Sequence, residues 1–245
     1  MISFGSRSLG TLRRRPLNVM DGVFHKSEWM ETDPELAPSP TVFLAEQPPD
    51  CELLPHFHRQ NQFQLFVEGT GTIGKEQIRP VTIHYAGAYT GYGPILSGAD
   101  GLKYFTIRST FDTGITWATE WREKMVRGPK RHAQASVGEP WSADRLKALG
   151  DVRRETAIAS SGGLGADVAC LPPGTDAALP PIESSVGQFV FVLAGSASLN
   201  GTTLEPWESA FVPASDGDAR VTAGVDGAQL VALHMPPTAP EYMPR

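Results

Sequence analysis

The sequence predicts an all-β protein made of two copies of one domain. Glycine and proline are frequent, with 25 and 21 residues, and they separate short runs rich in Val, Ile, Phe, Tyr and Thr. This pattern is typical of many short strands joined by turns. Residues 56–69 also align without a gap on residues 182–195, at an offset of 188 − 62 = 126. A repeat of that length indicates domain duplication, because solenoid repeats are roughly 20 to 50 residues long.

The expected strands follow this repeat. The first half contains 41–45, 62–68, 81–86 and 103–109, and the second half contains their counterparts 166–171, 188–193, 209–212 and 229–234. We therefore expect an N-terminal domain over 1–118, a connecting segment over 119–155 and a C-terminal domain over 156–245.

A charged stretch, 119–150, interrupts the strand rhythm between the halves. Its end predicts a short helix, with Ser142 as N-cap, Leu146 and Leu149 on one buried face, and Gly150 as the stop. We interpret the stretch as a linker packed on the outside, with a lid across a site as the alternative.

Composition excludes several classes of protein. The formal net charge of −6 disfavours a nucleic-acid binder, and the Arg13-Arg14-Arg15 run is interpreted as a solvated N-terminal segment. No apolar run approaches the ~18 residues of a membrane span, and the N-terminal residues lack the apolar core of a signal peptide. We therefore expect a cytoplasmic protein with no membrane partner. Cys51 and Cys170 are not repeat equivalents, and both are expected to be reduced.

Three polar side chains in the first copy of the repeat suggest a site. In a continuous strand His56, His58 and Gln62 project to one face, and Gln64 follows on that face. Two imidazoles two residues apart can reach one divalent cation, and an oxygen donor farther along can provide a third ligand. The second copy lacks the histidines.

These residues resemble the first motif of the cupin superfamily, G-x5-H-x-H-x3 or 4-E-x6-G. The match runs through His56, His58 and Gly69, with Asp50 at the leading glycine and Gln62 at the glutamate. In the second half Ile182, Ser184 and Gln188 stand where the ligands would be, and Gly195 ends the motif. The second motif is only traceable, from Trp207 through Pro213 to Asp218 at its histidine. Subtracting 126 from 218 places Tyr92 at that position in the first half.

The resemblance implies one β-barrel of the double-stranded β-helix or jelly-roll type in each half, hence a bicupin whose second copy is degenerate. Metal-binding cupins hold Fe, Mn, Ni, Zn or a similar ion through three histidines and a carboxylate. This chain instead offers His56, His58, the neutral amide of Gln62 and the phenol of Tyr92, which must lose a proton to ligate well. Metal binding and a metal-free polar pocket both remain open, and no nucleotide cofactor is expected.

Other candidates lie nearby. His84 either points into the first barrel, where it would replace the missing third imidazole, or is a structural histidine. His84 and Tyr92 are the candidate acid/base groups, and Gln64 and Tyr89 are expected to contact substrate. The remaining histidines, His25, His132 and His234, are interpreted as surface or structural.

Function has to be argued from the site, because the cupin fold serves many activities. The first hypothesis is a metal-dependent dioxygenase, isomerase or lyase that acts on a small organic molecule in the N-terminal barrel. The second is a metal-free cupin that binds a small molecule without catalysis, or for regulation. A homodimer is left open.

Overall fold

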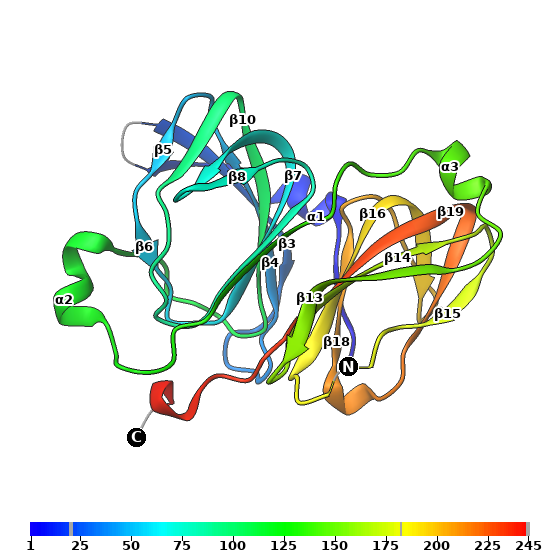
Figure 1. Ribbon diagram of the computed structural model, residues 1–245. Helices are drawn as coiled ribbons and strands as arrows, with labels where there is room; N and C mark the ends of the chain where they lie inside the picture. Colours follow the sequence, from blue (N-terminus) through cyan, green and yellow to red (C-terminus); the bar gives the residue numbers. More distant parts are fainter. Residues whose placement is uncertain (20–21, 182, 244–245) are drawn as a thin grey trace. The chain divides into compact units, whose positions relative to one another are not determined.

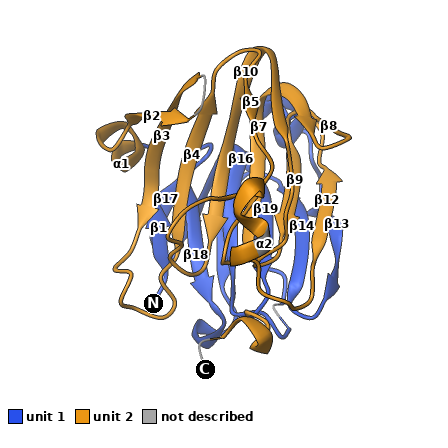
Figure 2. Ribbon diagram, turned by 90° about the vertical axis from the view of Figure 1, so that its left-hand side faces the viewer, with its two compact units in different colours: residues 1–7, 139–237 blue, residues 8–138, 238–245 orange. Residues whose placement is uncertain are grey.

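The computed structural model describes residues 1–19, 22–181 and 183–243. The chain forms two compact units, one of residues 8–138 with 238–245, and one of residues 139–237 with 1–7 (Figure 2). Each unit is built around one antiparallel sheet that curls into a barrel (Figure 1). No helix within the described residues is long and apolar enough to cross a membrane.

The N-terminal unit has its strands in the order β12-β9-β7-β10-β4-β3-β2. Their bounds are β2 Arg15–Val19, β3 Gly22–Glu31, β4 Thr41–Gln47, β7 Gln62–Ile73, β9 Thr82–Ala86, β10 Ile95–Arg108 and β12 His132–Ser136. Two short strands extend this sheet, β5 (Glu52–Leu53) beside β10 and β8 (Glu76–Ile78) beside β7. A separate pair joins β6 (His56–Phe57) to β11 (Thr116–Trp117). The helical pieces are α1 (Arg7–Leu12), which starts at the unit boundary, η1 (Ala118–Glu120), α2 (Trp121–Lys124) and η3 (Pro240–Tyr242).

The C-terminal unit has the order β1-β18-β16-β19-β14-β13. Its bounds are β1 Ser3–Gly5, β13 Arg153–Ser161, β14 Leu164–Leu171, β16 Gly187–Leu199, β18 Ser209–Pro213 and β19 Arg220–Met235. Strands β15 (Asp176–Ala178) and β17 (Thr202–Leu204) pair with β19 and β16, and α3 (Ala143–Lys147) and η2 (Ala214–Asp216) complete the unit.

The duplication is visible in the strand register. Every residue pair between β7 and β10 recurs between β16 and β19, 126 residues later; for example Gln64 opposite Thr106 becomes Val190 opposite Ala232. The same two register shifts interrupt the pairing in both copies. Before β7 the offset between the two copies is smaller. Ala45 pairs with Tyr104 and Ala169 pairs with its counterpart Leu230, so the offset there is 169 − 45 = 124. The loop that leads into the repeated motif is therefore two residues longer in the second half.

The glycine that ends the motif has the same role in both copies. Gly69 has φ +80° and Gly195 has φ +69°. A Cβ added to either would lie 2.0 Å from the Gly101 carbonyl oxygen or 2.1 Å from that of Gly227. Only glycine tolerates both this backbone conformation and this close approach of two strands.

The eight predicted strands are all present, and most are longer than predicted. The strands before residue 41 were not predicted, because Arg15–Glu31 has few turn residues and little alternation to mark it. The predicted helix is confirmed as α3: Ser142 Oγ accepts the Arg145 amide at 3.3 Å and Leu146 is buried. It ends at Lys147, before Gly150.

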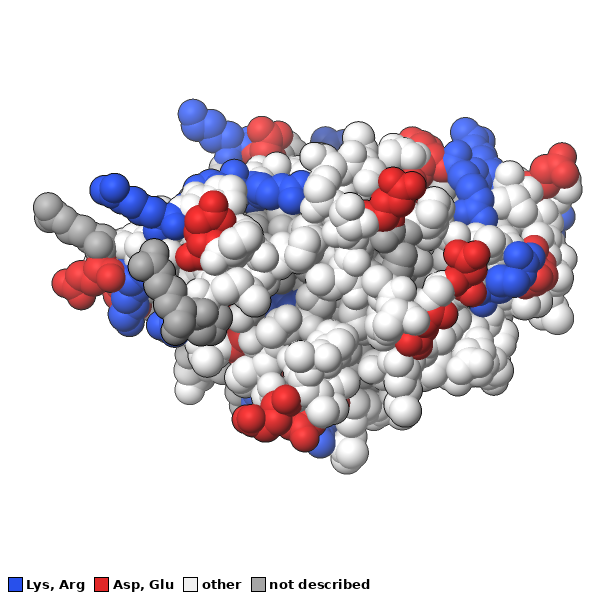
Figure 3. All heavy atoms as spheres, turned by 90° about the horizontal axis from the view of Figure 1, so that it is seen from below, with Lys and Arg blue, Asp and Glu red and all other residues white. Residues whose placement is uncertain are grey.

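Much of the 119–150 stretch belongs to the N-terminal unit. Strand β12 pairs along β9, with Gln134 opposite His84, and so becomes an edge strand of that sheet. Near the other end of the sheet, the arginine run makes exposed ion pairs, Arg13 with Glu31 and Arg14 with Glu46. Acidic and basic side chains are interspersed on the face of the molecule in Figure 3.

The two barrels differ in what lines their interiors. Inward positions of the C-terminal barrel carry Val190, Val192, Ala210 and Leu230 in one continuous apolar core. The N-terminal barrel has an apolar end around Phe66, Leu102 and Tyr104. Its opposite end carries buried polar side chains instead: His56, His58, Gln62, Gln64, His84, Thr106 and Arg108.

Candidate functional site

The N-terminal barrel encloses a cavity of about 940 Å³. His56, His58, Gln64, Thr106 and Arg108 supply part of its polar lining. Its apolar lining includes aromatic side chains, and the exposed residues Leu17 and Phe111 lie at its mouth. This size and this mixture of apolar walls with few polar groups are typical of small-molecule sites.

The first histidine is placed by a short β-bridge. The backbones of His56 and Tyr92 exchange hydrogen bonds, N to O, at 3.1 and 3.0 Å, so the two residues face each other. Tyr92 therefore lies beside His56, as the motif comparison predicts. The expected continuous strand from His56 to Gln64 is not formed. Strand β6 ends at Phe57 and β7 starts at Gln62, because the intervening residues form a loop whose Asn61 Oδ1 accepts the Ala88 amide at 2.9 Å.

A directed chain of hydrogen bonds links Arg108, Gln62, Tyr92 and His56. Arg108 donates to Gln62 Oε1 from Nη2 at 2.8 Å and from Nε at 3.1 Å. Gln62 Nε2 donates to Tyr92 Oη. His56 Nδ1 lies 2.8 Å from the Leu54 carbonyl, so it carries the hydrogen, and Nε2 accepts from Tyr92 Oη at 2.9 Å. Gln62 itself is buried and does not line the cavity.

His58 is oriented by a buried carboxylate. Its Nδ1 lies 3.0 Å from Asp112 Oδ1 and 3.1 Å from Arg108 Nη2. A carboxylate only accepts, so His58 Nδ1 donates to Asp112. The Arg108 guanidinium then acts on His58 through its positive charge and not as a hydrogen-bond donor. Asp112 also accepts the amides of Gly114 at 2.7 Å and Arg59 at 3.1 Å. His58 borders the cavity, and a backbone hydrogen bond to Gly114 also raises the pKa of its ring.

Burial and the arginine charge set the protonation states. Burial, and then the neighbouring His58, lower the pKa of His56 to about 3. Burial and then Arg108 also lower the pKa of His58, while Asp112 opposes this. The hydrogen bond from His58 and the charge of Arg108 outweigh burial and hold the pKa of Asp112 at about 2. Burial raises the pKa of Tyr92. Both imidazoles and the phenol are thus neutral near pH 7, while Arg108 and Asp112 are charged.

Gln64, His84 and His132 form a second polar cluster. His84 Nδ1 lies 2.9 Å from Gln64 Oε1, and His84 Nε2 lies 2.7 Å from His132 Nε2. His84 is fully buried and does not line the cavity, whereas its hydrogen-bond partner Gln64 does. Both readings of His84 therefore hold in part: it points inward, and it is paired. His132, interpreted as surface or structural, is exposed on β12 and pairs with His84.

Tyr89 and His25 do not lie where the sequence predicts. Tyr89, expected to contact substrate, does not line the cavity; its ring packs on Phe57 and Tyr242, at centroid distances of 5.4 and 4.9 Å. His25, interpreted as surface or structural, lines the cavity. Ile182, which replaces His56 in the repeat, lies outside the described residues.

Sequence reasoning missed Arg108 and Asp112. Arg108 is the last residue of β10, and a charged residue at the end of a strand usually faces solvent. The repeat did contain a signal, because 108 + 126 = 234 and His234 occupies the equivalent place in β19. His234 lies opposite Gln188. Arg108 comes directly after Ile107, which lies opposite Phe63. Asp112 lies in a loop, where no periodicity constrains it.

The donor set does not fit a divalent cation. Of the four predicted ligands, His56 Nε2, Gln62 Oε1 and the Tyr92 hydroxyl are engaged in the chain from Arg108, which leaves His58 Nε2. Arg108 also places a permanent positive charge beside these atoms, and like charges repel strongly in a buried site. Among the residues that the structure describes, no group of three or more His, Cys, Asp and Glu side chains could hold a metal ion.

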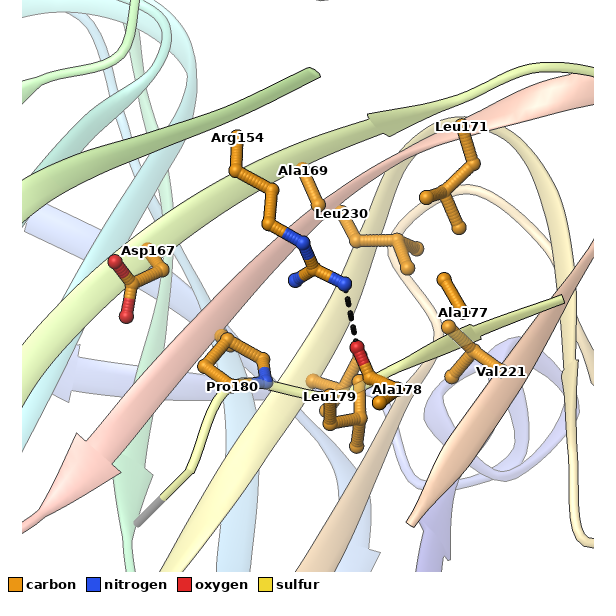
Figure 4. Close-up of a pocket in the computed structure, with 12 residues that line it drawn as sticks. Arg154, Asp167, Ala169, Leu171, Ala177, Ala178, Leu179, Pro180, Val221 and Leu230 are labelled. Carbon is orange, nitrogen blue, oxygen red and sulfur yellow. Dashed lines mark hydrogen bonds between the residues drawn. The ribbon is translucent and has the colours of Figure 1, made fainter. Parts of the chain in front are cut away.

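The equivalent region of the C-terminal barrel is filled. Its pocket has a volume of only about 10 Å³, close to the size of one water molecule. Figure 4 shows Arg154 reaching over the apolar side chains of Ala169 and Leu230 to the Ala178 carbonyl, to which it donates at 2.6 Å. Ser184 and Asp218, the counterparts of His58 and Tyr92, are exposed.

No protein-family model and no curated protein matches this sequence. Solved structures do match. A candidate dioxygenase from Nostoc punctiforme aligns with a TM-score of 0.62 at 11% identity, over 96% of this chain and 79% of that chain. Oxalate decarboxylase from Bacillus subtilis, a bicupin, aligns with a TM-score of 0.61 at 10% identity, over 96% and 77%.

The chain has the cupin fold, in two copies. The bacterial pirin YhhW of Escherichia coli, solved in complex with nickel(II), shares this fold with a TM-score of 0.58 at 11% identity, over 97% of this chain and 100% of that chain. At these identities the comparison establishes the fold, and the activity of this bicupin depends on its own site.

Proposed function

We propose that the N-terminal cupin barrel binds a small organic carboxylate and transfers protons on it without a divalent metal. The observation that supports this most is the buried Arg108, whose charge lies at the predicted metal site. Its Nη1 makes no hydrogen bond to a described residue, and Arg108 borders the cavity. A buried guanidinium with a free Nη1 is suited to a carboxylate, because hydrogen bonds from a charged donor to an ionised acceptor are strong.

His58 is the proposed general base. Asp112 holds the hydrogen of this imidazole on Nδ1 and so leaves the lone pair of Nε2 toward the cavity. A carboxylate that orients a histidine in this way also stabilises the imidazolium that forms when Nε2 takes a proton. A carboxylate bound at Arg108 would present its neighbouring carbon to His58, and Arg108 would stabilise the negative charge that develops there.

Tyr92 carries the second exchangeable hydrogen of the site. Burial keeps its phenol protonated, and His56 Nε2 accepts that hydrogen. Tyr92 also lines the cavity, so a bound substrate oxygen would compete with His56 Nε2 for this hydrogen. The reaction class that these groups support is isomerisation or elimination that begins with removal of a proton next to a carbonyl or carboxylate.

The test is hydrogen exchange on carbon. A panel of 2-oxo, 3-oxo and 2-hydroxy acids is incubated with the protein in D2O, and loss of the C–H signal is followed by NMR. We expect exchange in at least one acid, reduced about 10²-fold or more in His58→Gln and in Asp112→Asn. The matched control is Ser184→Ala at the counterpart of His58. Exchange that survives in His58→Gln, or binding of no acid at all by the wild type, would overturn the proposal.

A metal-dependent enzyme is the second candidate, and one observation favours it. Both His56 and His58 donate Nδ1 to an oxygen, which is how metal-ligating histidines are usually oriented. Elemental analysis of protein produced in medium supplemented with Fe, Mn, Ni and Zn distinguishes the candidates. One bound equivalent of metal that is lost in His58→Ala would support the second and contradict the first.

A further inference from the structure

We propose that Gln64 and Thr106 form a second polar subsite of the same cavity, which selects organic acids with a second hydrogen-bond-accepting oxygen. This inference rests on the proposed function, because it takes Arg108 as the carboxylate receptor. Gln64 and Thr106 face each other across β7 and β10 and both line the cavity. Each is more than nine-tenths buried, with exposed fractions of 2% and 4%.

The polar atoms of this subsite are available to a ligand. The only hydrogen bond of the Gln64 side chain among the described residues is the one between Oε1 and His84, so the Nε2 amide has no partner. The Thr106 hydroxyl makes no hydrogen bond to a described side chain or backbone group either, yet neither atom is fully enclosed by protein. Both atoms can therefore bond to a ligand in the cavity, where an acceptor on the ligand would replace water.

His84 and His132 determine which end of the Gln64 amide faces the cavity. An amide oxygen only accepts, so His84 carries its hydrogen on Nδ1 and donates it to Gln64 Oε1. His84 Nε2 then has the lone pair and accepts from His132 Nε2, 2.7 Å away. With its oxygen fixed by His84, Gln64 presents its NH₂ group to the cavity. His84 is therefore a positioning residue.

The spacing of the two subsites limits the length of the ligand. Thr106 and Arg108 are two residues apart on β10, and their side chains lie on one face. Two residues of strand correspond to about 6.6 Å, roughly the length of a five-carbon chain. The ligand class is therefore a short acid with a ketone, hydroxyl or second carboxylate at its far end. An ammonium group there would face the Gln64 donor, with only the Thr106 hydroxyl oxygen to accept from it, and should bind less well.

Three five-carbon probes test the inference by isothermal titration: pentanoate, 4-oxopentanoate and 5-aminopentanoate. We expect wild type to bind 4-oxopentanoate about 3- to 10-fold more tightly than pentanoate, as one or two neutral hydrogen bonds would give. It should bind 5-aminopentanoate more weakly than pentanoate. Gln64→Leu should reduce the ratio of 4-oxopentanoate to pentanoate affinity, and Gln64→Glu should make 5-aminopentanoate the preferred probe.

The positioning role of His84 has its own readout. His84→Phe should reduce the ratio of 4-oxopentanoate to pentanoate affinity, and His84→Asn, whose amide N–H can replace Nδ1–H, should restore it. Val190→Ala, at the counterpart of Gln64, is the control and should leave the ratio unchanged. If pentanoate binds in an Arg108-dependent way but the ketone has no advantage, the second subsite is wrong and the proposed function stands. If no probe binds, or binding survives in Arg108→Met, the carboxylate receptor itself is wrong.

Discussion

Arg108 donates two hydrogen bonds to the single oxygen of Gln62, at 2.8 and 3.1 Å, inside the N-terminal barrel. The glutamine replaces the glutamate of the cupin motif, and the arginine contributes the positive charge that a metal would otherwise supply. The two changes are physically consistent, because a neutral amide oxygen accepts from a guanidinium without cancelling its charge. The guanidinium keeps its charge beside Gln62, and the nearby ionised Asp112 offsets part of it.

We expect Arg108→Met to lose carboxylate binding. Removing one partner of a buried, charged hydrogen bond typically costs about 2 kcal/mol or more, which corresponds to about 30-fold or more in affinity. Titration with the best-binding acid measures this effect. Arg154→Met in the C-terminal barrel is the control and should bind the acid like wild type. Unchanged affinity in Arg108→Met would place the receptor elsewhere.

We expect the double variant Gln62→Glu, Arg108→Met to gain metal affinity. It restores the carboxylate of the motif beside two imidazoles and removes the competing cation, so three donors become free to converge. Titration with Zn²⁺ or Ni²⁺ should show one site that wild type lacks, and adding His58→Ala should abolish it. Equal metal binding by wild type and the double variant would show that Arg108 does not block the site.

Stability should fall as the pH decreases below about 6.5. The pKa values of the buried histidines His56, His58, His84 and His234 are all lowered, chiefly by burial. The unfolded chain therefore binds protons that the folded chain does not, so the stabilising contribution is complete above the unfolded pKa of about 6.5 and is lost toward acid pH. His56, whose pKa is lowered to about 3, contributes about 1.4 kcal/mol per pH unit in that window.

Urea unfolding at pH 7, 6, 5 and 4.5 measures this dependence. His56→Gln should flatten it by about one proton, because the pKa of His56 is lowered to about 3 and the whole window lies above that value. A free energy of unfolding that is constant from pH 7 to 4.5 would show that these histidines are accessible to protons in the folded state.

The two motif glycines should be equally intolerant of substitution. Gly69→Ala and Gly195→Ala each force a positive φ on alanine and place a Cβ against a carbonyl oxygen. The backbone conformation alone costs about 1–2 kcal/mol, and the steric conflict adds to it. Thermal unfolding should show both variants destabilised, whereas Gly150→Ala, which has open space and no positive φ, should be close to wild type. A large difference between the two motif variants would contradict their equivalence.

The sequence by itself determined the strand-rich class, the domain duplication and the N-terminal half as the one with polar residues in the repeated motif. Strand periodicity and turn residues are local signals, and the ungapped alignment of Gln62 on Gln188 already contained the register that β7 and β16 share. The cupin resemblance and the repeat offset together put Tyr92 at the second-motif histidine position, and in the structure Tyr92 lies beside His56.

Only the tertiary structure decided what the polar end of the barrel is made of. Arg108 and Asp112 reach His58 across 50 and 54 residues of sequence, and no local pattern specifies contacts between a strand end, a loop and another strand. The same holds for His84, whose two partners come from β7 and β12. Which atoms of Gln62, Tyr92 and His56 are free to bind a ligand depends on the hydrogen bonds that folding completes among them, because each donor or acceptor used within the protein is no longer available to a metal.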